Sequence, residues 1–161
     1  MHKLNLAGLC LSVLCAASAC SSQTDPNKLK DQITGDAKGT AHVNGQCALF
    51  TQAEVAAYVG MPVGPGENTS GGAGCRWSSE GFEAWATIAV VSPDYFPEPS
   101  GVDGFKRWPA MGERAWVAPD SGWSAGAVDS DAAIVVVIYG KKASEAAAIS
   151  LLQNAIQRRT K

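Results

Sequence analysis

Five short apolar runs, each followed by a turn signal, limit what this chain can fold into more than any other feature. The runs are four to eight residues long, which is typical of β-strands. Proline, aspartate, serine and glycine at 119–122 predict a tight turn before the fourth run, and 129–131 predict another before the fifth, so these runs form an antiparallel meander. The expected strands are 75–78, 85–91, 115–118, 123–128 and 132–139. Since 85–91 is apolar at every position but one, we expect it to be a central strand covered on both faces.

A capped helix is expected to precede these strands. Thr51 and Glu54 have the spacing of a capping box, in which each side chain accepts a hydrogen bond from the backbone N–H of the other residue. The helix should run over 52–59, because Gly60 suits the left-handed position that ends a helix and Pro62 prevents its continuation.

A second helix is expected at the C-terminal end, over 143–159, with Ser144 near its start and Arg158 and Arg159 at its negative end. Its apolar stripe comprises Ala148, Ile149, Leu152, Ala155 and Ile156. The predicted fold class is therefore α+β, with an antiparallel sheet of about four to five strands on which an N-terminal and a C-terminal helix pack.

The first twenty residues have the pattern of an export signal. Lys3 gives a basic start, and the apolar stretch 4–17 is too short to span a bilayer. It ends at 17–20 in Ala-Ser-Ala-Cys, which resembles the bacterial lipobox. The resemblance implies that residues 1–19 are removed and that Cys20 receives a lipid; the alternative is an ordinary signal cleavage that leaves Cys20 as a free thiol. Ser21 resembles the sorting position for the outer membrane in a cell with two membranes, which would place the protein there, facing the periplasm.

Residues 20–46 are expected to form a flexible tether and residues 47–161 a single globular domain. The tether is polar, its charges cancel, and it could extend to about 85 Å. Cys10 and Cys15 would leave with the signal, so the domain keeps only Cys47 and Cys75. Two cysteines in an exported domain predict one disulfide. A zinc site is the disfavoured alternative, because zinc needs four ligands and His42 is the last histidine of the mature chain.

Several of these motifs together resemble a bacterial surface-lipoprotein family of unknown function. They are the cysteine before the capped helix, the Cys-x-Trp motif at 75–77, and the stretch 109–116, where a Gly-Glu-Arg-Ala turn precedes an apolar strand. The resemblance covers nearly the whole domain. It implies an envelope location and a disulfide between Cys47 and Cys75, and it brings no catalytic residue.

The chain carries one weak catalytic pattern. Residues 122–126 match the Gly-x-Ser-x-Gly motif of serine hydrolases around Ser124, but no histidine follows it and two strands rather than a strand and a helix surround it. A serine–lysine pair with Lys141 or Lys142 is the remaining enzymatic alternative. We therefore expect a protein that is not an enzyme and that needs no cofactor and no metal, and the weak overall charge argues against a nucleic-acid partner.

Binding to a protein partner is the function that the sequence favours. The long connection 92–109 holds four prolines and several aromatic residues, and long structured loops often carry function. Between Glu54 and Asp131 the chain has eleven acidic residues and four basic ones. This excess of negative charge would steer a basic partner toward the domain. One such protein would be an immunity protein or inhibitor of a secreted cell-wall enzyme; the alternative is a passive or glycan-associated lipoprotein. The candidate partner-binding residues are Tyr95, Phe96, Asp103, Phe105 and Trp108, with Trp108 expected to be exposed and Trp77, Trp85 and Trp116 expected in the core.

Overall fold

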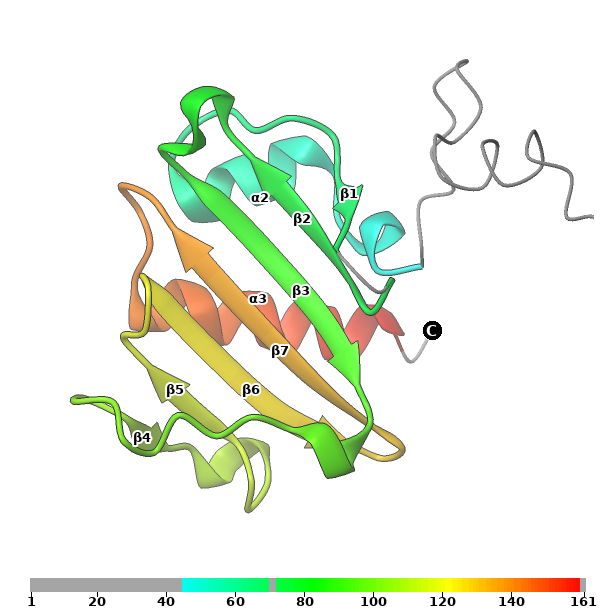
Figure 1. Ribbon diagram of the computed structural model, residues 1–161, viewed down its shortest axis with the longest axis vertical. Coiled ribbons are helices and arrows are strands. Elements are labelled where there is room, and N and C mark those ends of the chain that lie inside the picture. Colours follow the sequence, from blue (N-terminus) through cyan, green and yellow to red (C-terminus); the bar gives the residue numbers. More distant parts are fainter. Residues whose placement is uncertain (1–44, 70–71, 160–161) are drawn as a thin grey trace, which may run out of the picture. The chain divides into compact units, whose positions relative to one another are not determined.

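A single antiparallel sheet of seven strands organises the domain. The computed structural model describes residues 45–69 and 72–159 (Figure 1). The expected signal segment, Cys20 and the tether up to residue 44 lie outside the described residues. The strands are β1 (Glu67–Asn68), β2 (Gly74–Ser78), β3 (Trp85–Val91), β4 (Lys106–Arg107), β5 (Trp116–Ala118), β6 (Trp123–Asp129) and β7 (Ala132–Tyr139).

The strand order is β1-β2-β3-β7-β6-β5-β4, so two meanders meet at the centre of the sheet. The first comprises β1 to β3 and the second β4 to β7, and β3 and β7 join them over seven residue pairs, from Trp85 opposite Tyr139 to Val91 opposite Ala133. The helices are α2 (Gln52–Val59) and α3 (Glu145–Arg159), with short 3-10 turns η1 (Cys47–Leu49), η2 (Glu80–Phe82), η3 (Pro93–Tyr95) and η4 (Pro109–Met111).

The predicted α+β class is confirmed, whereas the predicted strand number is too low. All five expected strands are present, and β1 and β4 are additional. Both additional strands have only two residues, all of them polar and exposed, so no apolar alternation marks them in the sequence. Within the described residues, no helix has both the length and the apolar character needed to cross a membrane.

Helix α2 has the predicted bounds and the predicted caps. The Thr51 hydroxyl accepts a hydrogen bond from the Glu54 N–H at 3.3 Å, and the Glu54 carboxylate accepts one from the Thr51 N–H at 2.8 Å. Gly60 ends the helix with a φ of 87° and donates its N–H to the carbonyl of Ala56. Local hydrogen bonds therefore determine both ends of this helix.

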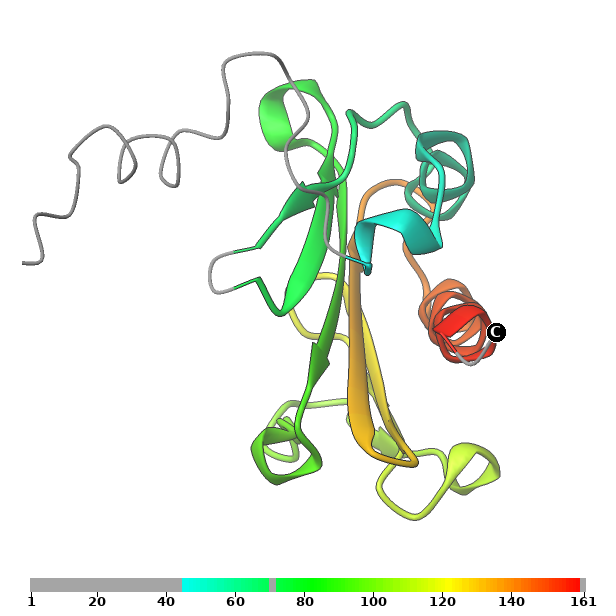
Figure 2. The same ribbon diagram turned by 90° about the vertical axis from the view of Figure 1, so that its right-hand side faces the viewer.

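Both helices lie on the same face of the sheet, which Figure 2 shows edge-on. The main core fills this space with side chains from alternate strand positions and from the inner side of the helices, among them Trp77, Ile88, Ile134, Ile138 and Leu151. On α3 the buried residues are Ala148, Leu151, Leu152 and Ala155, so the stripe includes Leu151, while Ile149 and Ile156 are half-buried.

In the part of the chain that the structure describes, no α-helix covers the other face of the sheet, which corrects the expectation that β3 is covered on both sides. On this face, called the open face below, β3 presents Trp85, Thr87, Ala89 and Val91, all half-buried. A second cluster of Phe96, Trp116, Ala118 and Ala133 covers one end of the open face. The long connection after β3 folds over this end, so part of the connection serves as packing.

The Cys47–Cys75 disulfide is present and ties η1 to β2. Cys47 is 7% exposed and Cys75 is fully buried, so the bond forms part of the main core. The connection after α2 passes close to it: a Cβ on Gly66 would lie 2.6 Å from the Cys75 Sγ. Only glycine fits there without movement of the core.

Glu54 also links the two helices. Its carboxylate receives two hydrogen bonds from the Arg158 guanidinium, at 2.7 and 3.1 Å, and Arg158 donates a further one to the carbonyl of Leu49. The guanidinium lies 4.3 Å from the centre of the Phe50 ring. Arg158, followed by the Thr51 backbone and hydroxyl, lowers the pKa of Glu54 to about 2.

We expect Glu54→Gln to lower the free energy of unfolding by about 1 kcal/mol at pH 7, because glutamine keeps the cap but loses the ion pair, which is partly screened by solvent. The folded-state pKa of Glu54 lies below the 4.5 of the free carboxyl, so its stabilising effect is complete above pH 4.5 and disappears as the pH falls toward 2. Urea denaturation from pH 7 to pH 2 checks this. Glu113→Gln is the matched control, because Glu113 is exposed and forms no ion pair with another described residue. A difference in the free energy of unfolding between wild type and Glu54→Gln that stayed the same at every pH would contradict the prediction.

Candidate functional site

The long connection brings together few of the residues that the sequence analysis assigned to a partner. Tyr95 is 81% exposed and Asp103 is exposed. Phe96 is buried, and Phe105 is half-buried, with both rings near the Trp116 ring at centroid distances of 6.1 and 6.4 Å. Trp108 is half-buried against the main core, so the expectation that it is exposed is wrong.

Ion pairs link the connection 92–109 to the rest of the domain. Glu98 binds Arg107 at 2.6 Å and Arg114 at 3.3 Å, and these two arginines, Arg107 foremost, lower the pKa of the Glu98 carboxyl. Lys106 binds Glu145 of α3 at 2.6 Å. The basic residues of the connection are thus neutralised, and its aromatic residues other than Tyr95 are used in packing.

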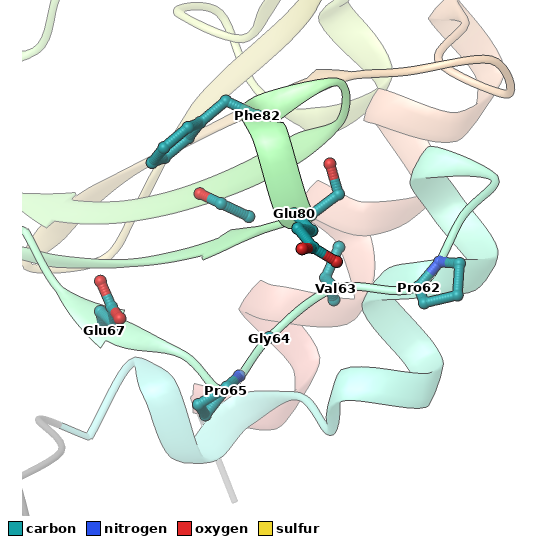
Figure 3. A pocket seen from close by; sticks show the side chains of 9 residues that line it. Pro62, Val63, Gly64, Pro65, Glu67, Glu80 and Phe82 are labelled. Carbon is teal, nitrogen blue, oxygen red and sulfur yellow. The ribbon is translucent and has the colours of Figure 1, made fainter.

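A cleft of about 470 Å³ opens at the other end of the sheet (Figure 3). One wall is the connection between α2 and β1, and the other is η2 with the end of β2. A hydrogen bond of 2.8 Å from the Gly64 N–H to the Ser78 carbonyl holds the two walls side by side. The lining residues are Pro62, Val63, Gly64, Pro65, Glu67, Ser78, Ser79, Glu80 and Phe82.

The turn at η2 places Phe82 at this cleft. Ser79 closes the turn: its N–H donates to the Ala84 carbonyl and its hydroxyl accepts from the Ala84 N–H, both at 2.8 Å. Gly81 and Phe82 then follow with φ values of 71° and 58°. A positive φ costs a bulky residue about 1 kcal/mol or more. The Phe82 side chain is 66% exposed in this strained conformation.

A row of aromatic rings continues from Phe82 onto the open face. The Arg76 guanidinium lies 5.5 Å from the centre of the Phe82 ring and 4.8 Å from that of Trp85. Trp85 in turn stacks with Tyr139, its cross-strand neighbour, with centroids 6.2 Å apart and planes 20° from parallel. Trp85 is therefore half-exposed on the sheet surface instead of in the core, while Trp77 and Trp116 are buried as expected.

The charges of the described part divide unevenly. Five ion pairs use Lys106, Arg107, Arg114, Arg158 and Arg159, and they leave Arg76, Lys141 and Lys142 as the basic residues without an ion pair among residues 45–69 and 72–159. Most acids of this part form none. Two of these free acids, Glu67 and Glu80, line the cleft, and Glu83 is exposed one residue beyond η2. The lining of the cleft therefore includes two acidic residues and no basic one, and Arg76 lies beside it over the Phe82 ring.

The serine of the hydrolase-like motif is part of the sheet. Ser124 is 4% exposed, and its hydroxyl donates a hydrogen bond of 3.2 Å to the carbonyl of Ala118. Lys141 and Lys142 are exposed in the turn before α3, and no hydrogen bond joins them to Ser124 in the described structure. No three potential metal-ligating side chains gather among the described residues.

A second, smaller cavity of about 310 Å³ lies where the described chain begins, between Gly45, Leu49, Val90 and the two arginines at the end of α3. Both arginines already have acidic partners, Glu54 and Asp131.

Sequence reasoning missed the larger cleft because its walls are formed by a proline-containing connection and a turn, neither of which has a periodic pattern.

Comparisons of this chain with protein-family models, curated proteins and solved structures found no match.

Proposed function

We propose that this protein is a lipid-anchored envelope lipoprotein that binds a basic protein partner at the acidic cleft between the α2–β1 connection and η2. The single observation that carries the proposal is the charge distribution. Among residues 45–69 and 72–159, most basic side chains form ion pairs, whereas Glu67 and Glu80, which line the cleft, form none. Unpaired carboxylates in a concave site attract and orient a positively charged partner.

An inhibitor or immunity protein that protects the envelope from a secreted, basic cell-wall enzyme is the specific form of this proposal. The lipobox-like motif at 17–20 supports a location in the cell envelope, since a lipid on Cys20 would hold the domain where such an enzyme acts. The buried and hydrogen-bonded Ser124 gives no support to the hydrolase alternative. The cleft takes the place of the 95–108 connection as the binding surface, because Phe96, Phe105 and Trp108 are used in packing.

We expect the double variant Glu67→Gln/Glu80→Gln to bind the partner about five- to tenfold more weakly than wild type at low salt, because two charge interactions are lost. The full-length chain in detergent serves as bait for secreted and envelope extracts, and the affinity of each captured basic protein is then measured at 50 and 300 mM salt. Because salt screens exposed charges, the affinity of the wild type should fall more steeply with salt than that of the variant.

The matched control is Asp103→Asn/Glu113→Gln, which removes the same charge from the opposite end of the sheet and should leave binding unchanged. Equal loss from both double variants would show that only net charge matters and would rule out the cleft. If no protein is captured and the chain is retained on purified peptidoglycan, the glycan-associated alternative is the better account.

A further inference from the structure

The connection after β3 crosses one end of the open face without backbone hydrogen bonds to it. Residues 93–105, called the strap below, lie between β3 and β4, and Figure 2 shows their first turn, η3, on the side of the sheet away from α3. The hydrogen bonds of the strap backbone stay within the connection, such as Tyr95 N–H to Ser92 and Phe105 N–H to Val102. Among the described residues, none joins its backbone to the backbone of a strand. The strap can therefore lift without breaking the sheet.

Two aromatic side chains anchor the strap to the sheet. Phe96 is 7% exposed, and its ring meets that of Trp116 over β6, where a Cβ on Gly126 would lie 2.8 Å from both rings. Phe105 is half-buried beside the same indole. This second cluster has four buried residues and is separate from the main core. Small satellite clusters under long loops open locally at a lower free energy than the core.

The closed strap leaves one buried polar group unsatisfied. Trp116 is 2% exposed, yet its indole N–H has no acceptor among the described residues. A buried donor without a partner raises the free energy of the closed state, and water satisfies that donor once it is uncovered. Opening of the strap therefore removes a destabilising feature of the closed state.

Two arginines outside the strap hold it from the solvent side. Glu98, within the strap, binds Arg107 at 2.6 Å and Arg114 at 3.3 Å. Arg114 also donates a hydrogen bond of 3.1 Å to the carbonyl of Pro93, and its guanidinium lies 5.1 Å from the centre of the Phe96 ring. We call Glu98, Arg107 and Arg114 the latch. Both arginines are exposed, so salt weakens the latch.

We infer that the strap is a lid that opens without unfolding of the domain, and that the latch controls how often it opens. Opening withdraws Phe96 from above Gly126, uncovers Trp116 and joins this end of the sheet to the rest of the open face. The inference goes beyond the proposed function: it concerns the end of the sheet opposite the cleft and does not depend on what the cleft binds.

Hydrogen exchange of the Trp116 indole N–H measures the opening, because burial rather than a hydrogen bond protects this group. NMR of the full-length chain in detergent follows this signal in D2O, together with the backbone amides of β7 at the centre of the sheet. We expect the protection factor of the indole, the ratio of its intrinsic to its observed exchange rate, to be at least about 100-fold below that of the β7 amides. Raising the salt from 50 to 500 mM should lower the indole protection factor about twofold or more.

Two variants test the latch. Glu98→Gln removes both of its ion pairs, so it should lower the indole protection factor about three- to tenfold and abolish the effect of salt. Asp131→Asn is the matched control, because it removes a different ion pair, with Arg159 at 2.6 Å, and should leave the indole protection factor unchanged. The salt series on the wild type keeps the inference testable if Glu98→Gln fails to fold.

Equal protection of the indole and the β7 amides would overturn the inference, because the strap would then open only when the whole domain unfolds. An equal effect of the two variants, or a salt effect that persists in Glu98→Gln, would overturn the assignment of the latch.

Discussion

Removing the Cys47–Cys75 disulfide is expected to lower the free energy of unfolding by about 3 to 4 kcal/mol. The bond closes a loop with a sequence separation of 28, and the entropy that this loop loses in the unfolded chain corresponds to that range. Cys75 is fully buried, so its replacement also leaves a small void beside Trp77. Urea denaturation of Cys47→Ala/Cys75→Ala, compared with wild type, measures the difference.

Reduction of the wild type provides the control. A reductant should shift the unfolding midpoint of the wild type toward that of the double variant and leave the midpoint of the variant unchanged. Alkylation of the unfolded, oxidised wild type should label neither cysteine. A difference of less than about 1 kcal/mol would mean that the unfolded chain retains structure around this loop or that the bond strains the native domain.

Gly140→Ala is expected to destabilise the domain by about 3 kcal/mol or more. Gly140 joins β7 to the turn before α3 with a φ of 144°, and a Cβ there would collide with the carbonyl of Val59 and lie 2.9 Å from the Cβ of Ala84. The carbonyl belongs to the last turn of α2 and also accepts a hydrogen bond from the N–H of Lys142. A methyl group would therefore separate α2 from the β7–α3 turn.

Gly81→Ala is the control that distinguishes the effect of a steric collision from the effect of backbone strain alone. Gly81 also has a positive φ, of 71°, but a Cβ there would meet nothing within 4 Å. We expect it to cost about 1 kcal/mol, the usual penalty of an L-residue in this conformation. Thermal and urea unfolding of both variants test the comparison, and equal losses would contradict the close approach at Gly140.

Local signals predicted the helices and long strands because their causes lie within a few residues. Thr51, Glu54 and Gly60 act on their own helix, and its bounds are confirmed. The strand 132–139 is also confirmed, and the others shift by no more than one residue at either end. The disulfide could be predicted because residues 47–161 contain only two cysteines, Cys47 and Cys75.

The remaining features depend on contacts between distant segments. Strands β1 and β4 exist because neighbouring strands offer them hydrogen bonds, and their own residues have no strand pattern. Trp108 and Phe96 look alike as aromatic residues among prolines, yet one packs on the main core and the other on the second cluster. The cleft arises from the pairing of Gly64 with Ser78, which no spacing in the sequence reveals.

The two-residue edge strands have a consequence for the association of one copy of the domain with another. An open β-edge acts as a template on which another chain can add a strand, and long flat edges lead to aggregation. Here β1 follows closely after Pro65, which has no N–H to donate, and β4 carries the charges of Lys106 and Arg107. Each edge thus offers few backbone groups, next to a proline or to charged side chains, on which another chain could add a strand.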